Sequence, residues 1–193
     1  MYIPSHFEVT DREEVYRFIR ANSFGQLISS VEGRAFSSHL PFLLSTDGQS
    51  LVCHVAKSNP QWQSIENQEV LLTFQGPHDY ISPSWYHSPG VPTWNYQAVN
   101  VYGKASLVTD SDKLASIVKE LSDTHEASLE TPWQAKYKES VLNIIIGIEI
   151  QITELQCKYK LSQNRPEIDQ QQIIKKLKKS GSFTLAKAMK NNN

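Results

Sequence analysis

Short turns connect the strand-like segments in the first third of the chain, and this spacing limits the available folds. Residues 27–31 and 35–44 flank the tight turn Glu32-Gly33-Arg34, and the turn Thr46-Asp47-Gly48-Gln49 leads into a strand over residues 50–56. A parallel strand pair needs a crossover of about a dozen residues or more, usually containing a helix, and these turns have no room for one. The sequence therefore predicts antiparallel pairing and argues against a doubly wound α/β sheet.

Three further strands are predicted at residues 69–74, 93–108 and 144–152. Gly76-Pro77 should close the first of them, and residues 78–92 have the proline-rich and serine-rich composition of a long ordered loop. In the last strand the isoleucines alternate with polar residues, so that one face carries Ile146, Ile148, Ile150 and Ile152. Six or seven strands in a chain of this length predict a mainly β, α+β protein: an antiparallel split β-barrel with peripheral helices.

Helices are predicted around this sheet. Thr10-Asp11-Arg12-Glu13 has the form of a capping box, which predicts a helix over residues 11–21. A short helix should begin near Pro60, and Asp110-Ser111 should cap another helix. The apolar stripe of the helix that follows Asp110 is formed by Leu114, Ile117, Val118 and Leu121. A further helical segment is expected over residues 133–142.

Composition excludes several classes of protein. No apolar run approaches the roughly 20 residues of a membrane span, and the start of the chain lacks a basic and then apolar signal segment, so we expect a soluble, cytoplasmic protein without membrane contacts. The isolated Cys53 and Cys157 and the scattered histidines have no metal-ligand spacing, so no metal is expected. Sequence motifs typical of serine hydrolases, P-loop NTPases and Rossmann dehydrogenases are absent.

Charge divides the chain into an acidic body and a basic end. From Ile173 onward there are six lysines and no acidic residue, whereas the whole chain has a net charge of −1. We therefore predict a domain over residues 1–168 and a basic helical tail over residues 169–193. Such a tail either contacts the phosphates of nucleic acid or is a solvated end. The acidic body has no pair of helices around a glycine turn that would suggest DNA reading.

The segment His54 to Trp62 is the strongest candidate for chemistry. A strand ends there, Lys57 follows, Ser58 or Asn59 can cap the next helix, and Pro60 suits its first position. Free backbone N–H groups at a helix start, with a lysine and a hydroxyl nearby, can hold a phosphate. The alternative interpretation is an ordinary capped helix with a surface lysine.

Aromatic residues gather in two short stretches beyond this corner. Tyr80, Trp85 and Tyr86 surround Pro83, and Trp94 and Tyr96 flank Asn95. Such side chains suit a flat heteroaromatic ligand or a subunit interface, or they pack in an ordinary core. On the neighbouring predicted strands, His39 and His54 could meet as hydrogen-bonded structure or as ligand contacts.

Several long motifs in the chain resemble the PaiB-type family, which is described as FMN-binding negative transcriptional regulators. The resemblance runs in order from Tyr2 to about Asn164. The motifs that carry it include Ser38-His39-Leu40-Pro41, the segment His54 to Trp62, Ile81-Ser82-Pro83-Ser84-Trp85-Tyr86, Pro92-Thr93-Trp94-Asn95-Tyr96 and Lys160-Leu161-Ser162-Gln163-Asn164. Strings of this length and unusual composition are specific for the family.

The resemblance implies a flavin-reductase-like split barrel that forms a homodimer, with FMN in the groove between the subunits. In that fold the strand-to-helix corner after the third strand takes the FMN phosphate, and the resemblance places Ser38, His39 and Leu40 beside the isoalloxazine. The cofactor-binding residues implied are Ser38, His39, Leu40, His54, Val55, Ala56, Lys57, Ser58, Asn59, Trp94, Asn95, Tyr96, Lys160, Gln163 and Asn164. Cys157-Lys158-Tyr159 departs from the commoner Gly-Lys-Trp of the family. We therefore do not carry over to this strand the contacts that the family's stretch makes with the edge of the flavin.

Three functions remain open at this level. The first is an FMN-binding regulatory protein, a negative transcriptional regulator or flavin-dependent sensor, for which the lysine-rich tail would supply any DNA contacts. The second is an FMN-dependent oxidoreductase that uses a nicotinamide or another small-molecule electron donor. The third is a haem-handling split barrel, which depends on His39 and His54 approaching one another.

Overall fold

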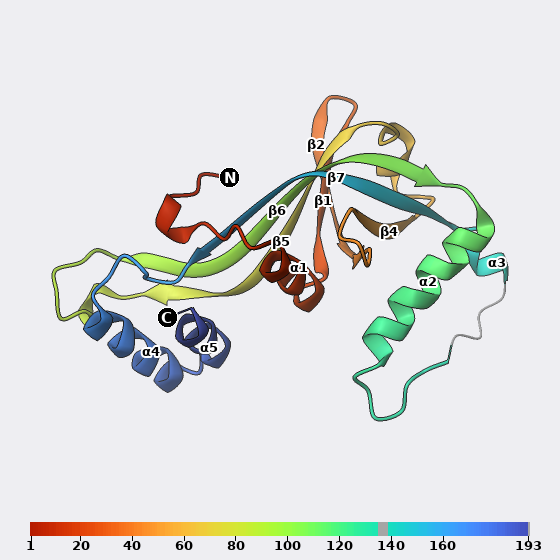
Figure 1. The fold of residues 1–193 in the computed structure, drawn as a ribbon. Helices are drawn as coiled ribbons and strands as arrows, with labels where there is room; N and C mark the ends of the chain where they lie inside the picture. Colours follow the sequence, from red (N-terminus) through yellow and green to blue (C-terminus); the bar gives the residue numbers. More distant parts are fainter. Residues whose placement is uncertain (135–138, 193) are drawn as a thin grey trace. The chain divides into compact units, whose positions relative to one another are not determined.

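The computed structural model describes residues 1–134 and 139–192, and Figure 1 shows the course of the chain. Its strands form one seven-stranded sheet in the order β2-β1-β5-β6-β7-β4-β3. The pairings of β1 with β2 and β5, and of β4 with β3 and β7, are antiparallel, as predicted. The strands are β1 (Phe24–Val31), β2 (Arg34–Pro41), β3 (Leu43–Leu44), β4 (Ser50–Ala56), β5 (Glu69–Ile81), β6 (Thr93–Val108) and β7 (Ile145–Lys160).

Side chains cap the starts of two helices that the sequence predicts. Asp110 accepts a hydrogen bond from Lys113 N at 2.7 Å and caps its helix as predicted. The first helix is capped by Asp11 rather than Thr10, because the Asp11 carboxylate accepts from Glu13 N at 3.0 Å. The elements are α1 (Arg12–Ala21), α2 (Ser111–Glu126), α3 (Glu139–Leu142), α4 (Glu167–Ser180) and α5 (Phe183–Asn191), with the 3-10 turns η1 (Ser5–Phe7), η2 (Pro60–Ser64) and η3 (Pro83–Trp85).

The chain folds into two compact units. Unit 1 consists of Met1–Phe18, Gln75–Val99 and Gln156–Asn193, and unit 2 consists of Ile19–Phe74 and Asn100–Leu155. Strands β5, β6 and β7 contribute residues to both units. In the part of the chain that the structure describes, no helix is long and apolar enough to cross a membrane.

Unit 2 has a core built from alternating strand residues. Ile148 and Ile150 on β7 are fully buried, and in the register of β4 and β7 they lie opposite Cys53 and Leu51. Ile146 is also buried and Ile152 is half-buried, which confirms the predicted apolar face of this strand. On the other face, α2 packs through a cluster formed by Val108, Leu114, Ile117 and Leu121, with Val52 against it. Burial on both sides holds β4 firmly in place.

Unit 1 combines the ends of three strands with the helical C-terminal segment. Phe18 of α1 packs against Tyr159 of β7, with ring centroids 5.6 Å apart. Both C-terminal helices contribute to the core of this unit, with buried residues Ile173, Leu177, Leu185, Ala186 and Met189. The boundary predicted at residue 168 stays a prediction.

Two strands are longer than predicted. β5 continues through Gly76-Pro77 to Ile81, so the predicted end of this strand and the first four residues of the predicted loop were wrong. A Cβ at Gly76 would stand 2.7 Å from Phe18 Cε2. The glycine in this strand therefore allows close packing against Phe18 and does not mark a turn. β7 likewise continues beyond Ile152 to Lys160.

Two other predicted elements also differ. The strand predicted over residues 35–44 is interrupted at Phe42, whose ring is buried and whose N–H donates to Ser23 O at 2.9 Å. The chain therefore bends between β2 and β3. Of the helix predicted over residues 133–142, residues 133 and 134 are not helical, residues 135–138 lie outside the described part of the chain, and only α3 is formed.

Candidate functional site

The corner between β4 and η2 in unit 2 is held by several hydrogen bonds. Lys57 N donates to Ile144 O at 2.8 Å, and the indole N–H of Trp62 donates to Lys57 O at 2.8 Å. Asn59 caps η2 by accepting from Gln61 N at 2.9 Å, and Pro60 occupies the first helical position as predicted. The backbone of this corner is therefore fixed independently of any ligand.

A second contact of Asn59 ties the corner to β2. Its side-chain amide donates to Ser38 Oγ at 2.9 Å, so the structure brings together Ser38 and the segment Lys57–Asn59. Ser38 and Leu40 are half-buried, and His39 between them is exposed, as expected from strand alternation. Within unit 2, Asn59 thus links β2 to the segment that carries the exposed Lys57 and Ser58.

The donors that remain at this corner fit a phosphate group. The backbone N–H groups of Lys57, Asn59 and Gln61 already donate within the chain, and η2 has only five residues, so the start of this helix is not the open anion site that the sequence suggested. The exposed Lys57 ammonium and Ser58 hydroxyl are available instead. Among the described residues, Lys57 Nζ forms no hydrogen bond or ion pair. A mobile cation beside a hydroxyl suits a phosphate dianion.

His54 occupies a different environment from His39. Its partner across the β4–β7 ladder is Gly147, whose missing Cβ would lie 2.8 Å from Val108 Cβ, so His54 is on the face that α2 covers. Burial lowers the pKa of His54, and its Nδ1 atom is buried without a hydrogen-bond partner among the described residues. His39 is exposed and stacks on Phe24 with ring centroids 6.3 Å apart.

The two remaining predicted residues of the corner, Val55 and Ala56, are the last residues of β4. Val55 is a core residue, 3% exposed, and Ala56 is exposed at the end of β4. In the described part of the chain no ring contact or hydrogen bond joins His39 to His54, and no cluster of three metal-ligating side chains is found. The approach of His39 to His54, on which the haem interpretation depends, is therefore not seen among the described residues.

The other predicted site residues belong to unit 1. Trp94 and Tyr96 share one face of β6, and Trp94 is 54% exposed beside His78 and Tyr80, at ring-centroid distances of 6.4 and 6.2 Å. Asn95 points to the opposite face, where it is fully buried and donates to Ser162 Oγ at 2.8 Å. Only the two aromatic residues present a surface to a ligand; Asn95 fixes the strand.

Lys160 and Gln163 lie at the end of β7 in unit 1. The Lys160 ammonium donates to Trp94 O at 2.6 Å and also to Thr93 Oγ1. Burial lowers the pKa of Lys160, and the nearby charges of Lys158 and Arg165 lower it further. Gln163 accepts from Leu161 N at 2.7 Å and so closes the turn after β7, and Asn164 is exposed.

Lys158 is a residue that the sequence analysis did not select. It is 7% exposed, its ammonium donates to Tyr2 O at 2.9 Å, and it lies 5.4 Å from the ring centroid of Tyr96. Strand alternation places it on the same face as Lys160, and this spacing was the signal that could have identified it.

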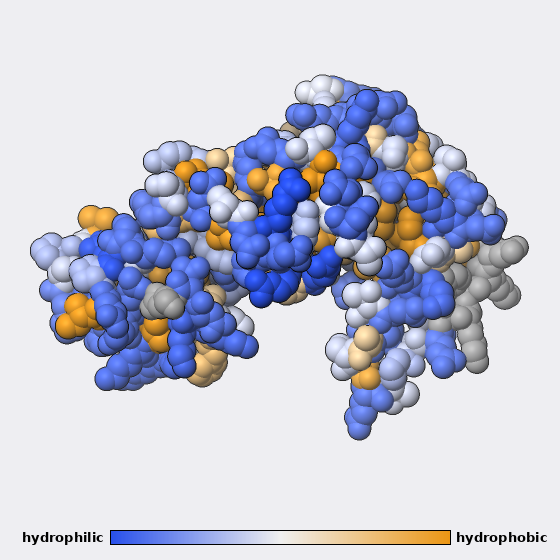
Figure 2. Space-filling view, in the orientation of Figure 1, coloured by the Kyte–Doolittle hydropathy of each residue, from blue (hydrophilic) through white to orange (hydrophobic). Residues whose placement is uncertain are grey.

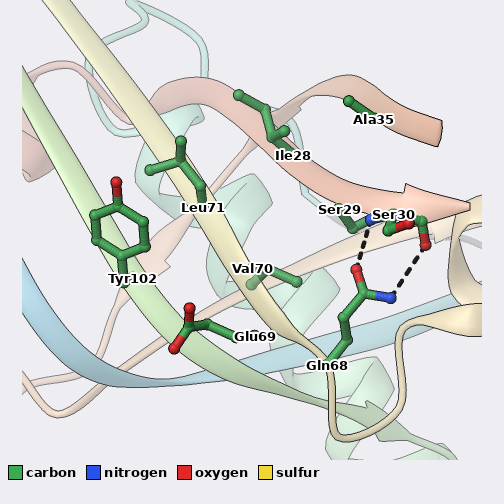
Figure 3. Close-up of a pocket in the computed structure, with 9 residues that line it drawn as sticks. All are labelled: Ile28, Ser29, Ser30, Ala35, Gln68, Glu69, Val70, Leu71 and Tyr102. Atoms are coloured by element: carbon green, nitrogen blue, oxygen red, sulfur yellow. Dashed lines mark hydrogen bonds between the residues drawn. The ribbon is translucent and has the colours of Figure 1, made fainter. Parts of the chain in front are cut away.

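Unit 2 also has an open cavity of about 480 Å³, drawn in Figure 3. The Gln68 amide brackets β1 there, accepting from Ser30 N at 2.5 Å and donating to Ser30 O at 3.1 Å. The lining residues are Ile28, Ser29, Ser30, Ala35, Gln68, Glu69, Val70, Leu71 and Tyr102, none of which is a predicted site residue. Its one carboxylate, Glu69, would repel a phosphate, so this cavity is a poor phosphate site.

Comparison with known proteins identifies the family. Residues 1–154 match the family model described as "Putative FMN-binding domain". The protein named Protease synthase and sporulation protein PAI 2, from Bacillus subtilis, is 43% identical over 185 residues, covering 92% of this chain and 89% of the relative. An uncharacterised protein from Emericella nidulans is 34% identical over 207 residues and covers 82% of each chain.

Solved structures share the fold at low sequence identity. The flavocytochrome Anf3 from Azotobacter vinelandii superposes with a TM-score of 0.65 at 18% identity, covering 82% of this chain and 72% of that one. The FAD and heme binding protein from Mycobacterium smegmatis gives 0.65 at 13% identity, covering 79% and 73%. The predicted antiparallel split barrel and the predicted PaiB-type resemblance are both confirmed. The chain belongs to the FMN-binding domain family that includes the PAI 2 protein, and its cofactor is FMN.

Proposed function

We propose that this chain is a flavin-binding regulatory protein that holds the phosphate of FMN at the β4–η2 corner of unit 2. The observation that carries the proposal is the Lys57 ammonium, exposed and without a counter-ion among the described residues, on a backbone fixed by Asn59. Such a preformed corner loses little conformational entropy when an anion binds. FMN, when bound, supplies the redox-active isoalloxazine ring.

The proposed roles of the chain's own residues follow from their positions. Lys57 and Ser58 donate to the phosphate, and Asn59 orients them by linking η2 to Ser38. β2 is the last strand in the sheet order, so one edge of its backbone has no strand partner. We assign the backbone groups of residues 38–40 on that edge to the polar rim of the flavin ring. The contribution of Trp94, Tyr96 and Lys160 to flavin binding stays part of the proposal.

The phosphate assignment is tested by comparing FMN with riboflavin, which lacks the phosphate. Lys57→Ala should weaken FMN binding by about 1–3 kcal/mol, roughly 5- to 150-fold, with the lower end favoured by the exposure of the side chain. Riboflavin affinity should not change. Fluorescence titration measures both, and Lys104→Ala, at an exposed lysine of β6 in the same unit, is the matched control. Equal FMN affinities in the variant and the wild-type protein would remove Lys57 from the site.

We extend the proposal to negative regulation of transcription by a cytoplasmic homodimer. The long motifs shared with the PaiB-type family support this extension, and sedimentation of the flavin-loaded protein tests the dimer. A monomer at micromolar concentration that still binds flavin would contradict it. Bleaching of bound flavin by NAD(P)H with sustained turnover would replace the regulatory role with that of an oxidoreductase.

A further inference from the structure

The helices α4 and α5 form a hairpin around a glycine turn in unit 1. Gly181 adopts a φ of +91°, its N–H donates to Lys178 O at 3.4 Å, and Ser182 N donates to Leu177 O at 2.9 Å. This is the Schellman pattern that ends a helix and reverses the chain. The acidic body has no pair of helices around a glycine turn that the sequence would predict, whereas the structure has such a pair in the basic segment.

The hairpin is a fixed part of unit 1. The buried Asp169 carboxylate near the start of α4 accepts from His87 N at 2.6 Å and also from the Ser88 hydroxyl. At the other end of α4, the Ser182 hydroxyl donates to Asp79 of β5. These contacts at both ends hold the hairpin against β5 and the loop that follows it, so its outer surface can act as a rigid docking face.

The apolar faces of both helices are already used inside unit 1. Ile173 and Leu177 of α4 and Leu185 and Met189 of α5 are each 1% exposed or less. A helix that binds a lipid surface needs a continuous free apolar face. Among the described residues, the large apolar side chains that these helices expose are Ile168 and Phe183, one in the first turn of each helix, and two separate side chains do not form such a face. The outer surface is mostly polar, as the hydrophilic colouring of this region in Figure 2 shows.

Positive charge is concentrated on that outer surface. The hairpin carries Lys175, Lys176, Lys178, Lys179, Lys187 and Lys190; all are exposed except Lys176, which is half-buried. None of the six forms a salt bridge within the described residues. The helix dipole favours lysines in the last turn of each helix, where Lys178, Lys179 and Lys190 lie. Lys175 and Lys187 lie before those last turns, so the dipole does not account for them.

Charge is divided unevenly between the two units. Counted on the sequence, unit 1 has 11 Lys and Arg residues against 7 Asp and Glu residues, whereas unit 2 has 8 against 13. The positive excess of unit 1 arises in the hairpin, because no acidic residue follows Asp169. A polyanion would therefore be attracted to one face of one unit and repelled by the other unit.

We propose that the α4–α5 hairpin binds the phosphate backbone of duplex DNA. The inference rests on the proposed regulatory function and names the surface through which it acts. Lysines are flexible point charges that contact phosphates without reading base sequence. A single-stranded partner would require aromatic platforms for its bases, and Phe183 is the one aromatic residue in these two helices.

The test measures the salt dependence of binding by the full-length, flavin-loaded protein. A labelled duplex of mixed sequence is titrated in fluorescence anisotropy at several salt concentrations. The variant Lys175→Gln/Lys178→Gln/Lys179→Gln removes three outer charges while keeping good helix formers. Its matched control, Arg20→Gln/Arg34→Gln/Lys104→Gln, removes the same charge from unit 2 at exposed residues that form no salt bridge within the described part of the chain.

We expect the hairpin variant to lose roughly 100-fold in duplex affinity near 0.15 M salt, and its slope of log affinity against log salt to become shallower by about 2–3. The control should match the wild-type protein. Equal slopes for the hairpin variant and the wild type would overturn the proposal, as would binding to anionic vesicles without binding to the duplex. FMN titration of these variants and of Lys57→Ala separates the two proposals. Wild-type FMN affinity in Lys57→Ala, with normal duplex binding, counts against the flavin site alone; wild-type FMN affinity in the hairpin variant, with an unchanged salt slope, counts against the hairpin alone.

Discussion

The hydrogen bond between Asn59 and Ser38 connects β2 to the corner after β4, and its contribution to stability can be isolated. Asn59→Ala removes two interactions: the cap on Gln61 N and the bond to Ser38 Oγ. Ser38→Ala removes only the second. A double-mutant cycle with these variants therefore separates the link between the two elements from the cap itself.

The expected magnitudes follow from the geometry. Loss of an N-cap side chain costs about 1 kcal/mol, and a side-chain hydrogen bond of 2.9 Å contributes about 0.5–1.5 kcal/mol. We expect Asn59→Ala to lower the free energy of unfolding by about 1.5–2.5 kcal/mol and Ser38→Ala by about 0.5–1.5 kcal/mol. The double variant should lose less than the sum, with a coupling of about 0.5–1.5 kcal/mol.

Urea denaturation of the four proteins measures this coupling. Ser37→Ala is the matched control, because Ser37 is the neighbouring residue on β2 and bonds to Gln26 rather than to the corner. Its effect should add to that of Asn59→Ala. If Ser38→Ala and Asn59→Ala also prove additive within about 0.3–0.5 kcal/mol, the bond does not hold β2 to the corner, and the reasoning is refuted.

Three further predictions concern buried groups. Burial lowers the pKa of His54 below its ordinary 6.5, so protons bind the unfolded chain more readily and the free energy of unfolding should fall as the pH drops below about 6.5. Urea titrations at stepped pH should show this slope, and His54→Gln should flatten it; an unchanged slope would contradict the assignment. Burial raises the pKa of Cys53, and that of Cys157 to about 12, so a thiol reagent should label neither cysteine in the folded protein and both in urea. Gly103→Ala would place a Cβ 2.5 Å from Ile150 Cγ2 and 2.6 Å from a backbone oxygen, and should cost about 1–3 kcal/mol in urea denaturation; wild-type stability would show that the strands can separate there.

Local patterns predicted the elements whose signals are contained in a few residues. The strands over residues 50–56 and 93–108 and the Asp110 cap were predicted correctly, because alternation and capping are short-range. The end of β5 was not. Gly76-Pro77 is typical of a turn, and only the packing of Phe18 against Gly76, far away in the sequence, reveals why a glycine stands there.

The candidate site likewise combines features that the sequence predicts locally with features that depend on tertiary packing. The cap and the exposed lysine were visible in the sequence, but the bond from Asn59 to Ser38 depends on how β2 folds back toward β4. The covering of His54 by α2 depends on tertiary packing and could not be predicted locally. By contrast, the opposite orientations of Asn95 and Trp94 follow from the two-residue repeat of a strand and were available from the start.

The late position of β7 in the chain affects how the protein is made. β4 pairs with β7 across roughly a hundred intervening residues, while β1, β2 and β3 find partners nearby. During synthesis from the N-terminus, the long edge of β4 remains unpaired until most of the chain has left the ribosome. This makes the nascent chain dependent on a long-range closure step, and it leaves residues 50–56 open to chaperones and to self-association until that step is complete.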